Sequence, residues 1–95
     1  MYNTPLDQAD FDRHYQEIHI PLASKLPGLR RYTVSKNAVA VQGESFYLVA
    51  ELDWDDLAAM QASLGSPEGA AAAADVETFA TGGVRSLVFE LDDVL

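Results

Sequence analysis

The two histidines of the chain, His14 and His19, are the side chains best suited to acid–base chemistry, because imidazole titrates near neutral pH. They stand five residues apart in a segment with helical spacing, which separates them by roughly 140° around a continuous helix. A zinc-chelating pair on a helix uses a four-residue spacing instead, and the chain contains no cysteine. We therefore expect no metal site and no cofactor. We predict that His14 is an exposed helix residue.

His19 has two interpretations. It precedes Pro21, at which the helix is expected to break, so its ring could brace the backbone carbonyls that the break leaves free. It could instead line a cavity and act as a general acid or base.

Glu51 is the most interesting carboxylate, because it lies on an otherwise apolar face of a predicted strand. It is exposed at the strand end, paired with Arg85, or directed toward His19 as a proton-transfer partner. Tyr47 is a candidate to assist such chemistry. The candidate ligand-binding residues are Tyr15, Tyr32, Val49 and Val88. The three tyrosines, Tyr15, Tyr32 and Tyr47, also fit core or dimer-contact packing.

The elements that position these side chains begin with a helix. Apolar residues recur at intervals of four, three and four from Phe11 to Leu22, which predicts a helix that starts at residues 7–10. Pro21 should kink or end it near His19, and Pro21–Leu26 should form a second short helical piece.

Three strands are predicted: residues 29–36 with a continuation at 39–41, residues 46–53, and residues 84–91. Asn37 marks an irregularity in the first. Apolar side chains occur on both faces of the second and third strands. A sheet with this pattern needs cover on both sides.

Two further helices should lie between the second and third strands. The first is predicted to be capped by Asp53 and to end at Gly65, with Leu57, Met60 and Leu64 as its buried stripe. The second should start at Ser66-Pro67 and carry an alanine run.

This order is βαββαβ once a nearly missing first strand, Met1-Tyr2, is included, and it predicts a ferredoxin-like α+β subunit that spans residues 1–95 as one domain. Helices then cover one sheet face only. The apolar residues on the bare face predict a twofold dimer, with a cavity between the two sheets.

The charge pattern restricts the partners. A formal net charge of −9 argues against nucleic acid and against an anionic membrane surface. Five of the six basic residues fall between positions 13 and 36. This segment is expected to meet acidic residues of the same chain or of a second subunit, or to guide an anionic small molecule. No apolar run is long enough to cross a membrane, and no secretory signal is evident, so we expect a cytoplasmic protein.

The chain resembles the EthD family of the dimeric α+β barrel superfamily. The resemblance is carried by Phe11-Asp12-Arg13-His14-Tyr15, by His19-Ile20-Pro21-Leu22, and by Leu26-Pro27-Gly28-Leu29-Arg30-Arg31-Tyr32. It implies a ferredoxin-like subunit, a dimer and a pocket between sheet and helices, and the family-typical histidine maps onto His19. The chain departs from the family at the first strand. The true start lies upstream, the neighbouring strands close up, or another subunit supplies the strand.

The resemblance implies no settled reaction. Bacterial EthD members are mostly uncharacterised, fungal relatives include decarboxylases and dehydratases, and other barrel relatives are cofactor-free monooxygenases, isomerases or cyclases. We expect a small cofactor-free enzyme that acts on an apolar or aromatic molecule. The alternatives are a non-catalytic binding or accessory protein of a degradation pathway, and a purely structural dimer.

Overall fold

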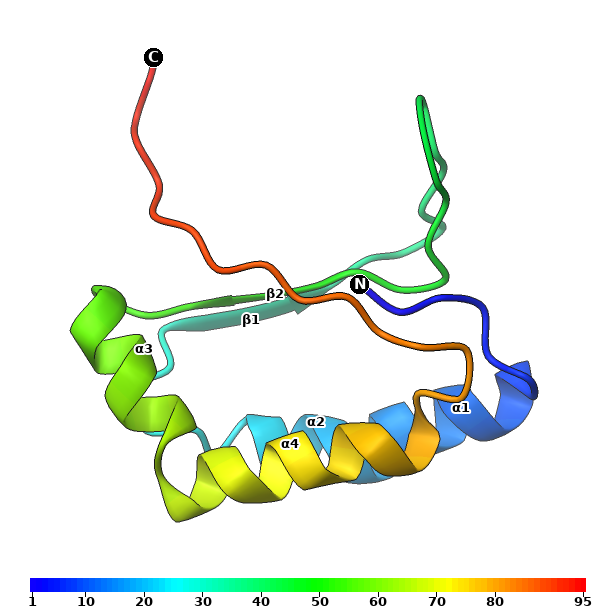
Figure 1. Ribbon diagram of the computed structural model, residues 1–95, viewed down its shortest axis with the longest axis horizontal. Coiled ribbons are helices and arrows are strands. Elements are labelled where there is room, and N and C mark those ends of the chain that lie inside the picture. The colour runs from blue at the N-terminus through cyan, green and yellow to red at the C-terminus, as the bar shows by residue number, and fades with distance from the viewer.

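The computed structural model describes residues 1–95 and shows helices packed against one side of a small antiparallel sheet (Figure 1). The elements in chain order are α1 (Gln8–His14), η1 (Tyr15–His19), α2 (Ile20–Ala23), β1 (Arg31–Val34), β2 (Ala50–Asp53), α3 (Leu57–Leu64) and α4 (Pro67–Phe79). Helices α1, α2 and α4 lie beneath the strands, and α3 closes one end. This is the predicted α+β class.

The first helix passes through Pro21 without ending. Asp7 caps α1, as its side chain accepts a hydrogen bond from the backbone N–H of Asp10. A π-helical turn, η1, follows, in which the N–H of Ile20 bonds to the carbonyl of Tyr15. A proline disrupts the normal helical bonding before it, and a π-turn is one way to absorb such a defect. The irregularity falls near His19, as predicted, and the second piece is Ile20–Ala23 rather than 21–26.

The sheet has the strand order expected of a ferredoxin-like fold. β1 pairs antiparallel with β2, with Tyr32 opposite Leu52. Tyr2 forms antiparallel bridges to both Leu48 and Val84. The reduced first strand at Tyr2 therefore lies at the centre of the sheet. Its neighbours are the segment that leads into β2, at Leu48, and the last segment of the chain, at Val84.

The strands are shorter than predicted. The continuation at 39–41 is wrong: Val39 and Val41 are 83% and 99% exposed on a loop that rises from the sheet (Figure 1). Asn37 does mark an irregularity, with a φ of 50°. The predicted strand 84–91 is reduced to the bridge at Val84, because the first strand offers almost no partner backbone beyond it. Residues 85–95 form no element and run away from the body of the molecule.

Helix α3 differs in detail from the prediction. Asp56, not Asp53, caps α3, because its side chain accepts from the N–H of Ala59. Two of the three residues predicted as its buried stripe are exposed, Leu57 at 42% and Leu64 at 47%, whereas Met60 is half-buried. Gly65 ends α3 and Ser66 caps α4, as expected.

The core is an aromatic cluster between helices and sheet: Tyr2, Phe11, Tyr15 and Phe79. The Tyr2 ring lies 5.4, 5.7 and 5.6 Å from the rings of Phe11, Tyr15 and Phe79. Such edge-on and tilted contacts add to the burial energy of each ring. None of the helices has the length and apolar character needed to cross a membrane.

Candidate functional site

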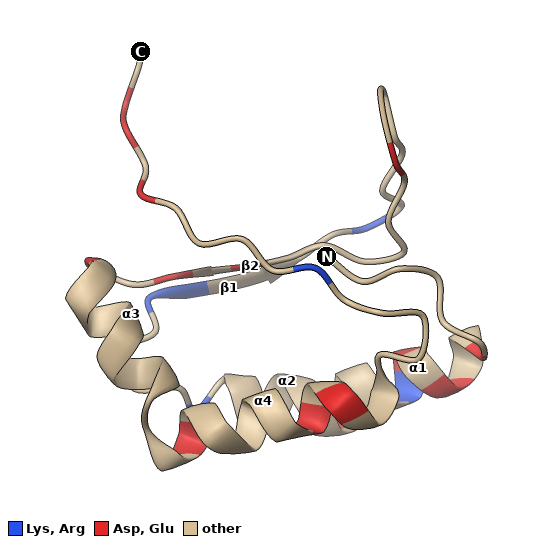
Figure 2. Ribbon diagram, viewed as in Figure 1, with Lys and Arg blue, Asp and Glu red and all other residues tan.

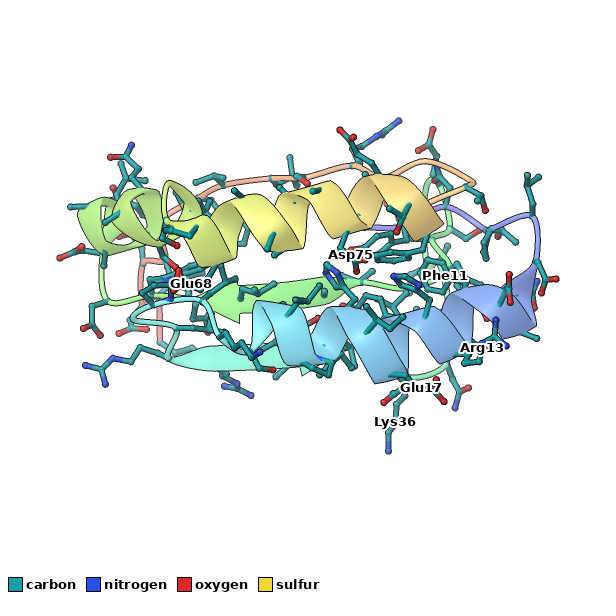
Figure 3. All side chains as sticks on the ribbon, turned by 90° about the horizontal axis from the view of Figure 1, so that it is seen from below. Phe11, Arg13, Glu17, Lys36, Glu68 and Asp75 are labelled. Atoms are coloured by element: carbon teal, nitrogen blue, oxygen red, sulfur yellow. The ribbon has the colours of Figure 1, made fainter.

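A single carboxylate joins the two histidines. Nε2 of His14 lies 2.8 Å from Oδ1 of Asp75, and Nδ1 of His19 lies 3.0 Å from Oδ2 of the same residue. Figure 3 shows Asp75 between α4 and the N-terminal helix. His14 is the last residue of α1 and His19 the last of η1, so the π-turn helps to set which face of the helix His19 presents. We call His14, Asp75 and His19 the imidazole–carboxylate cluster.

The cluster is graded in burial. The His19 side chain is 7% exposed, that of Asp75 11% and that of His14 25%. The prediction that His14 is an exposed helix residue is therefore wrong, because its ring is partly covered by α4 and held by Asp75.

The second ring nitrogen of His19 has no hydrogen-bond partner in the chain. Ser63 Oγ is the one fully buried side-chain polar atom that lacks a partner. Nε2 of His19 also lacks a partner but is not fully buried, so it keeps contact with solvent. A histidine whose Nδ1 is hydrogen-bonded to a carboxylate presents Nε2 as the basic nitrogen.

Burial and the shared carboxylate act in opposite directions on the imidazole. Burial lowers the pKa of His19 below its ordinary 6.5 and outweighs the raising effect of Asp75. Burial alone would raise the pKa of Asp75, but the hydrogen bonds from His14 and His19 hold it below its ordinary 3.8. At neutral pH the cluster therefore consists of a carboxylate and a neutral, oriented His19.

Aromatic rings surround the cluster. The His19 ring centre lies 4.9 Å from that of Phe79 and 5.2 Å from that of Tyr15. The His14 ring stacks on Phe79 with ring centres 4.9 Å apart. These contacts fix both imidazoles through packing as well as through hydrogen bonding.

Tyr15 and Tyr32 form a second polar pair beside the cluster. Their hydroxyl oxygens lie 2.6 Å apart. Burial raises the pKa of both hydroxyls, and it raises the pKa of neighbouring Tyr2 to about 12. All three phenols are therefore neutral hydrogen-bonding groups at physiological pH.

Glu51 does not accompany His19. It lies opposite Thr33 in the β1–β2 ladder and is exposed, whereas its neighbours Ala50 and Leu52 are partly buried. Because side chains alternate along a strand, Glu51 points away from the helices. It also does not pair with Arg85, whose side chain lies 3.2 Å from Glu44.

The remaining predicted site residues are dispersed. Tyr47 donates a hydrogen bond to Asp12 at 2.8 Å and packs edge-on against Phe11. Val49 is 36% exposed, and Val88 is 61% exposed in the C-terminal segment. The structure thus places Tyr15 and Tyr32 beside His19. Glu51, Tyr47, Val49 and Val88 lie outside this group.

Asp75 is the residue of the cluster that was not predicted from the sequence. A signal was present: Asp75 stands three residues after Ala72 and four before Phe79, so an acid shares a helix face with two residues that turn out to be buried. Acidic residues are almost never buried without a partner.

Two of the surface cavities of the molecule border its helices. One of about 270 Å³ sits between α2 and α4 and is lined by Leu22, Lys25, Pro67, Glu68 and Ala71. The other, of about 430 Å³, lies beside Asp12 and Tyr47 at the base of the 36–46 loop. His19 lines neither. No group of three or more His, Cys, Asp or Glu side chains is arranged to hold a metal ion.

Comparison with known proteins agrees with the fold. The EthD domain matches residues 3–83. An uncharacterized 11.0 kDa protein of Rhodococcus erythropolis, described by its place in the thcB-thcC intergenic region, is 38% identical over 96 residues, covering 100% of this chain and 93% of the relative. The crystal structure of an ethyl tert-butyl ether D (EthD) family protein from Bacillus halodurans c-125 matches with a TM-score of 0.74 and 38% identity, over 81% of this chain and 78% of that one. The chain belongs to the EthD family.

Proposed function

We propose that the protein is a cofactor-free enzyme that moves a proton on an apolar or aromatic small molecule, with His19 as the acid–base group. The observation that supports this most directly is the geometry of His19. Its Nδ1 is held by Asp75, and its Nε2 has no partner but keeps contact with solvent. A buried, oriented and neutral imidazole with one free nitrogen is suited to accept a proton.

The proposed step is a proton transfer and its reversal. Nε2 of neutral His19 takes a proton from a carbon or hydroxyl of the bound molecule, which leaves that molecule with the electron pair. The resulting imidazolium is stabilised by the Asp75 carboxylate. His19 then returns the proton to the same or another atom of the molecule. Asp75 contributes as a positioning residue, because it fixes the ring orientation and tautomer.

The test uses hydrogen–deuterium exchange, since it reports proton transfer without requiring a known product. Native mass spectrometry of protein purified from its natural host would identify a retained small molecule, which is then incubated with the protein in D₂O. We expect C–H exchange with the wild-type protein and loss of exchange with His19→Gln. Tyr47→Phe is the matched control and should exchange normally, because Tyr47 bonds to Asp12 outside the cluster. Equal exchange by wild type and His19→Gln would refute the acid–base assignment.

A second candidate function is binding without catalysis. It is favoured by the small exposure of His19, which is 5% for the residue, and by the absence of His19 from the walls of both cavities. A binding protein would retain the same small molecule but would leave its C–H bonds unexchanged. The D₂O experiment therefore separates the two functions.

We further propose that the working unit is a homodimer formed through the sheet face opposite the helices. The C-terminal segment supports this, since Leu87, Val88 and Phe89 are 69%, 61% and 62% exposed. The charges also complement one another: Figure 2 shows acidic positions along that segment and basic positions at β1. Arg31 and Lys36 form no ion pair within the chain and are available to a second copy.

A further inference from the structure

The cavity between α2 and α4 and the imidazole–carboxylate cluster lie along the same interhelical contact. Leu22 of the cavity stands three residues after His19, and Ala71 stands four residues before Asp75. Residues three or four apart on a helix are neighbours on one face, about 5–6 Å apart. Each wall of the cavity is therefore one helical turn from its counterpart in the cluster.

The step from His19 to Leu22 and the step from Asp75 to Ala71 lead toward the same end of the helix pair. In Figure 1 the N-terminal helix and α4 run in opposite directions, so the end of α2 lies beside the start of α4. Positions after His19 on one helix thus meet positions before Asp75 on the other. Leu22 and Ala71 are therefore the lining residues nearest to His19 and Asp75 along the two helices, one turn away from each. The free Nε2 of His19 retains solvent contact.

The lining of the cavity combines apolar walls with one unpaired cation. Leu22, Pro67 and Ala71 supply the apolar surface. Lys25 makes no ion pair in the chain, not even with Glu68 across the same cavity. Glu68 lies in the first turn of α4, where the helix dipole favours a carboxylate, which accounts for its presence without a ligand.

We propose that this groove is the entrance to His19 and that it admits a small apolar carboxylic acid. The apolar part lies against Leu22, Pro67 and Ala71, the carboxylate contacts the Lys25 ammonium, and the far end approaches Nε2 of His19. The volume of about 270 Å³ lies just below the usual range for drug-sized ligands, so it suits a molecule of the size of benzoate. The assignment rests on the proposed acid–base role of His19 and names the substrate class for it.

Benzoate is the probe, titrated into ¹⁵N-labelled protein and followed through backbone amide resonances. We expect shifts concentrated at Leu22, Lys25 and Ala71, with a dissociation constant on the order of 1 mM for so small a ligand. Benzyl alcohol, which has the ring but no charge, should bind more weakly. No saturable shift in these residues up to about 50 mM benzoate would overturn the groove assignment.

Charge variants test the orientation of the ligand. Lys25→Gln should weaken benzoate binding about three-fold, and Glu68→Gln should strengthen it by a similar factor, as expected for partly exposed charges. Lys36→Gln, a lysine far from the groove in sequence and absent from its walls, should leave binding unchanged. An equal effect of Lys25→Gln and Lys36→Gln would contradict the proposed contact.

A blocking variant separates this inference from the proposed function. Ala71→Phe fills the cavity, while Ala73→Phe places the same ring at an exposed position of α4 that does not line it. Loss of benzoate binding in Ala71→Phe alone supports the groove, and equal binding by both variants overturns it. Deuterium exchange of a carboxylic acid that persists in Ala71→Phe overturns the groove but not the role of His19. Groove binding without any exchange overturns the role of His19 but not the groove.

Discussion

Asp75 Oδ2 lies 3.0 Å from Nδ1 of His19, across the contact between α4 and the N-terminal helix. The same carboxylate holds Nε2 of His14 at 2.8 Å through its other oxygen. No other side-chain hydrogen bond joins α4 to the helical segment 8–23. Asp75 therefore links the two helices and orients the imidazole that we assign to proton transfer.

Replacement of Asp75 by Asn should destabilise the fold. An amide offers one acceptor oxygen and one NH2 donor in place of two acceptor oxygens, so at least one of the two imidazoles loses its N–H···O bond. We expect a loss of about 2 kcal/mol in the free energy of unfolding, measured by urea denaturation. Glu77→Gln, an exposed acid on the same helix, is the control and should change stability by less than about 0.5 kcal/mol. Similar losses in both variants would show that the carboxylate of Asp75 has no special role.

The pKa of His19 in Asp75→Asn distinguishes an electrostatic role of Asp75 from a purely structural one. Asp75 raises the pKa of His19 against the larger lowering effect of burial, so removal of its charge should lower that pKa further. The measurement is the pH titration of the His19 ring by NMR. An unchanged or raised His19 pKa in Asp75→Asn would contradict the proposed electrostatic coupling.

The stability of the protein should fall as the pH is lowered below neutrality. The pKa of His19 is below 6.5 in the folded state, so the unfolded chain binds more protons between the two values. The contribution of neutral His19 to the free energy of unfolding is complete above pH 6.5. It is lost as the pH falls toward the folded-state pKa of His19. Asp75, whose pKa lies below 3.8, adds a second loss as the pH falls through that lower value.

Urea midpoints measured between about pH 7.5 and pH 5 test the first of these losses. The wild-type midpoint should decrease across this range, and His19→Gln should flatten the decrease because it removes the titrating ring. If the His19→Gln protein keeps the full wild-type slope, then another group is responsible for it.

The Tyr15–Tyr32 pair should show strong coupling in a double-mutant cycle. Tyr32→Phe leaves the buried Tyr15 hydroxyl without its partner at 2.6 Å, which should cost about 1–3 kcal/mol. The double variant Tyr15→Phe/Tyr32→Phe removes both hydroxyls and should be less destabilised than the sum of the two single variants. Tyr47→Phe is the control, because its hydroxyl bonds to Asp12 at the surface. Strict additivity of the two losses would contradict the pairing.

Much of the fold was predictable because local signals and tertiary packing agree. The apolar spacing from Phe11 to Leu22 predicted a helix, and Phe11 and Tyr15 of that set are in the core, whereas Ile18 is 46% exposed. Ser66-Pro67 predicted the start of α4, which begins there. Pro21 predicted an irregularity near His19. The sequence could not show that a π-turn would absorb it, because that outcome depends on α4 holding the segment in place.

The strands were less predictable. Apolar alternation in residues 84–91 is typical of a strand, but a strand forms only where partner backbone is present. Within one chain, Tyr2 supplies a partner for Val84 and little beyond it. The same dependence on partners explains the candidate site. His19 was identified from its own position, whereas Asp75 comes from a helix 56 residues away in sequence, and only the folded chain brings the two together.

The C-terminal segment provides the test of the proposed homodimer. Phe89 is 62% exposed, and no backbone hydrogen bond within the chain involves residues beyond Arg85. If a second copy covers this segment, Phe89→Asp places a charge in an apolar contact and should weaken dimerisation at least about ten-fold, as measured by sedimentation equilibrium. Leu6→Asp, at a position 88% exposed near the start of α1, is the control and should leave the dimer intact. A wild-type protein that sediments as a monomer would refute the dimer. Equal effects of both substitutions would refute this interface, because only a residue that the second copy covers should respond to an introduced charge.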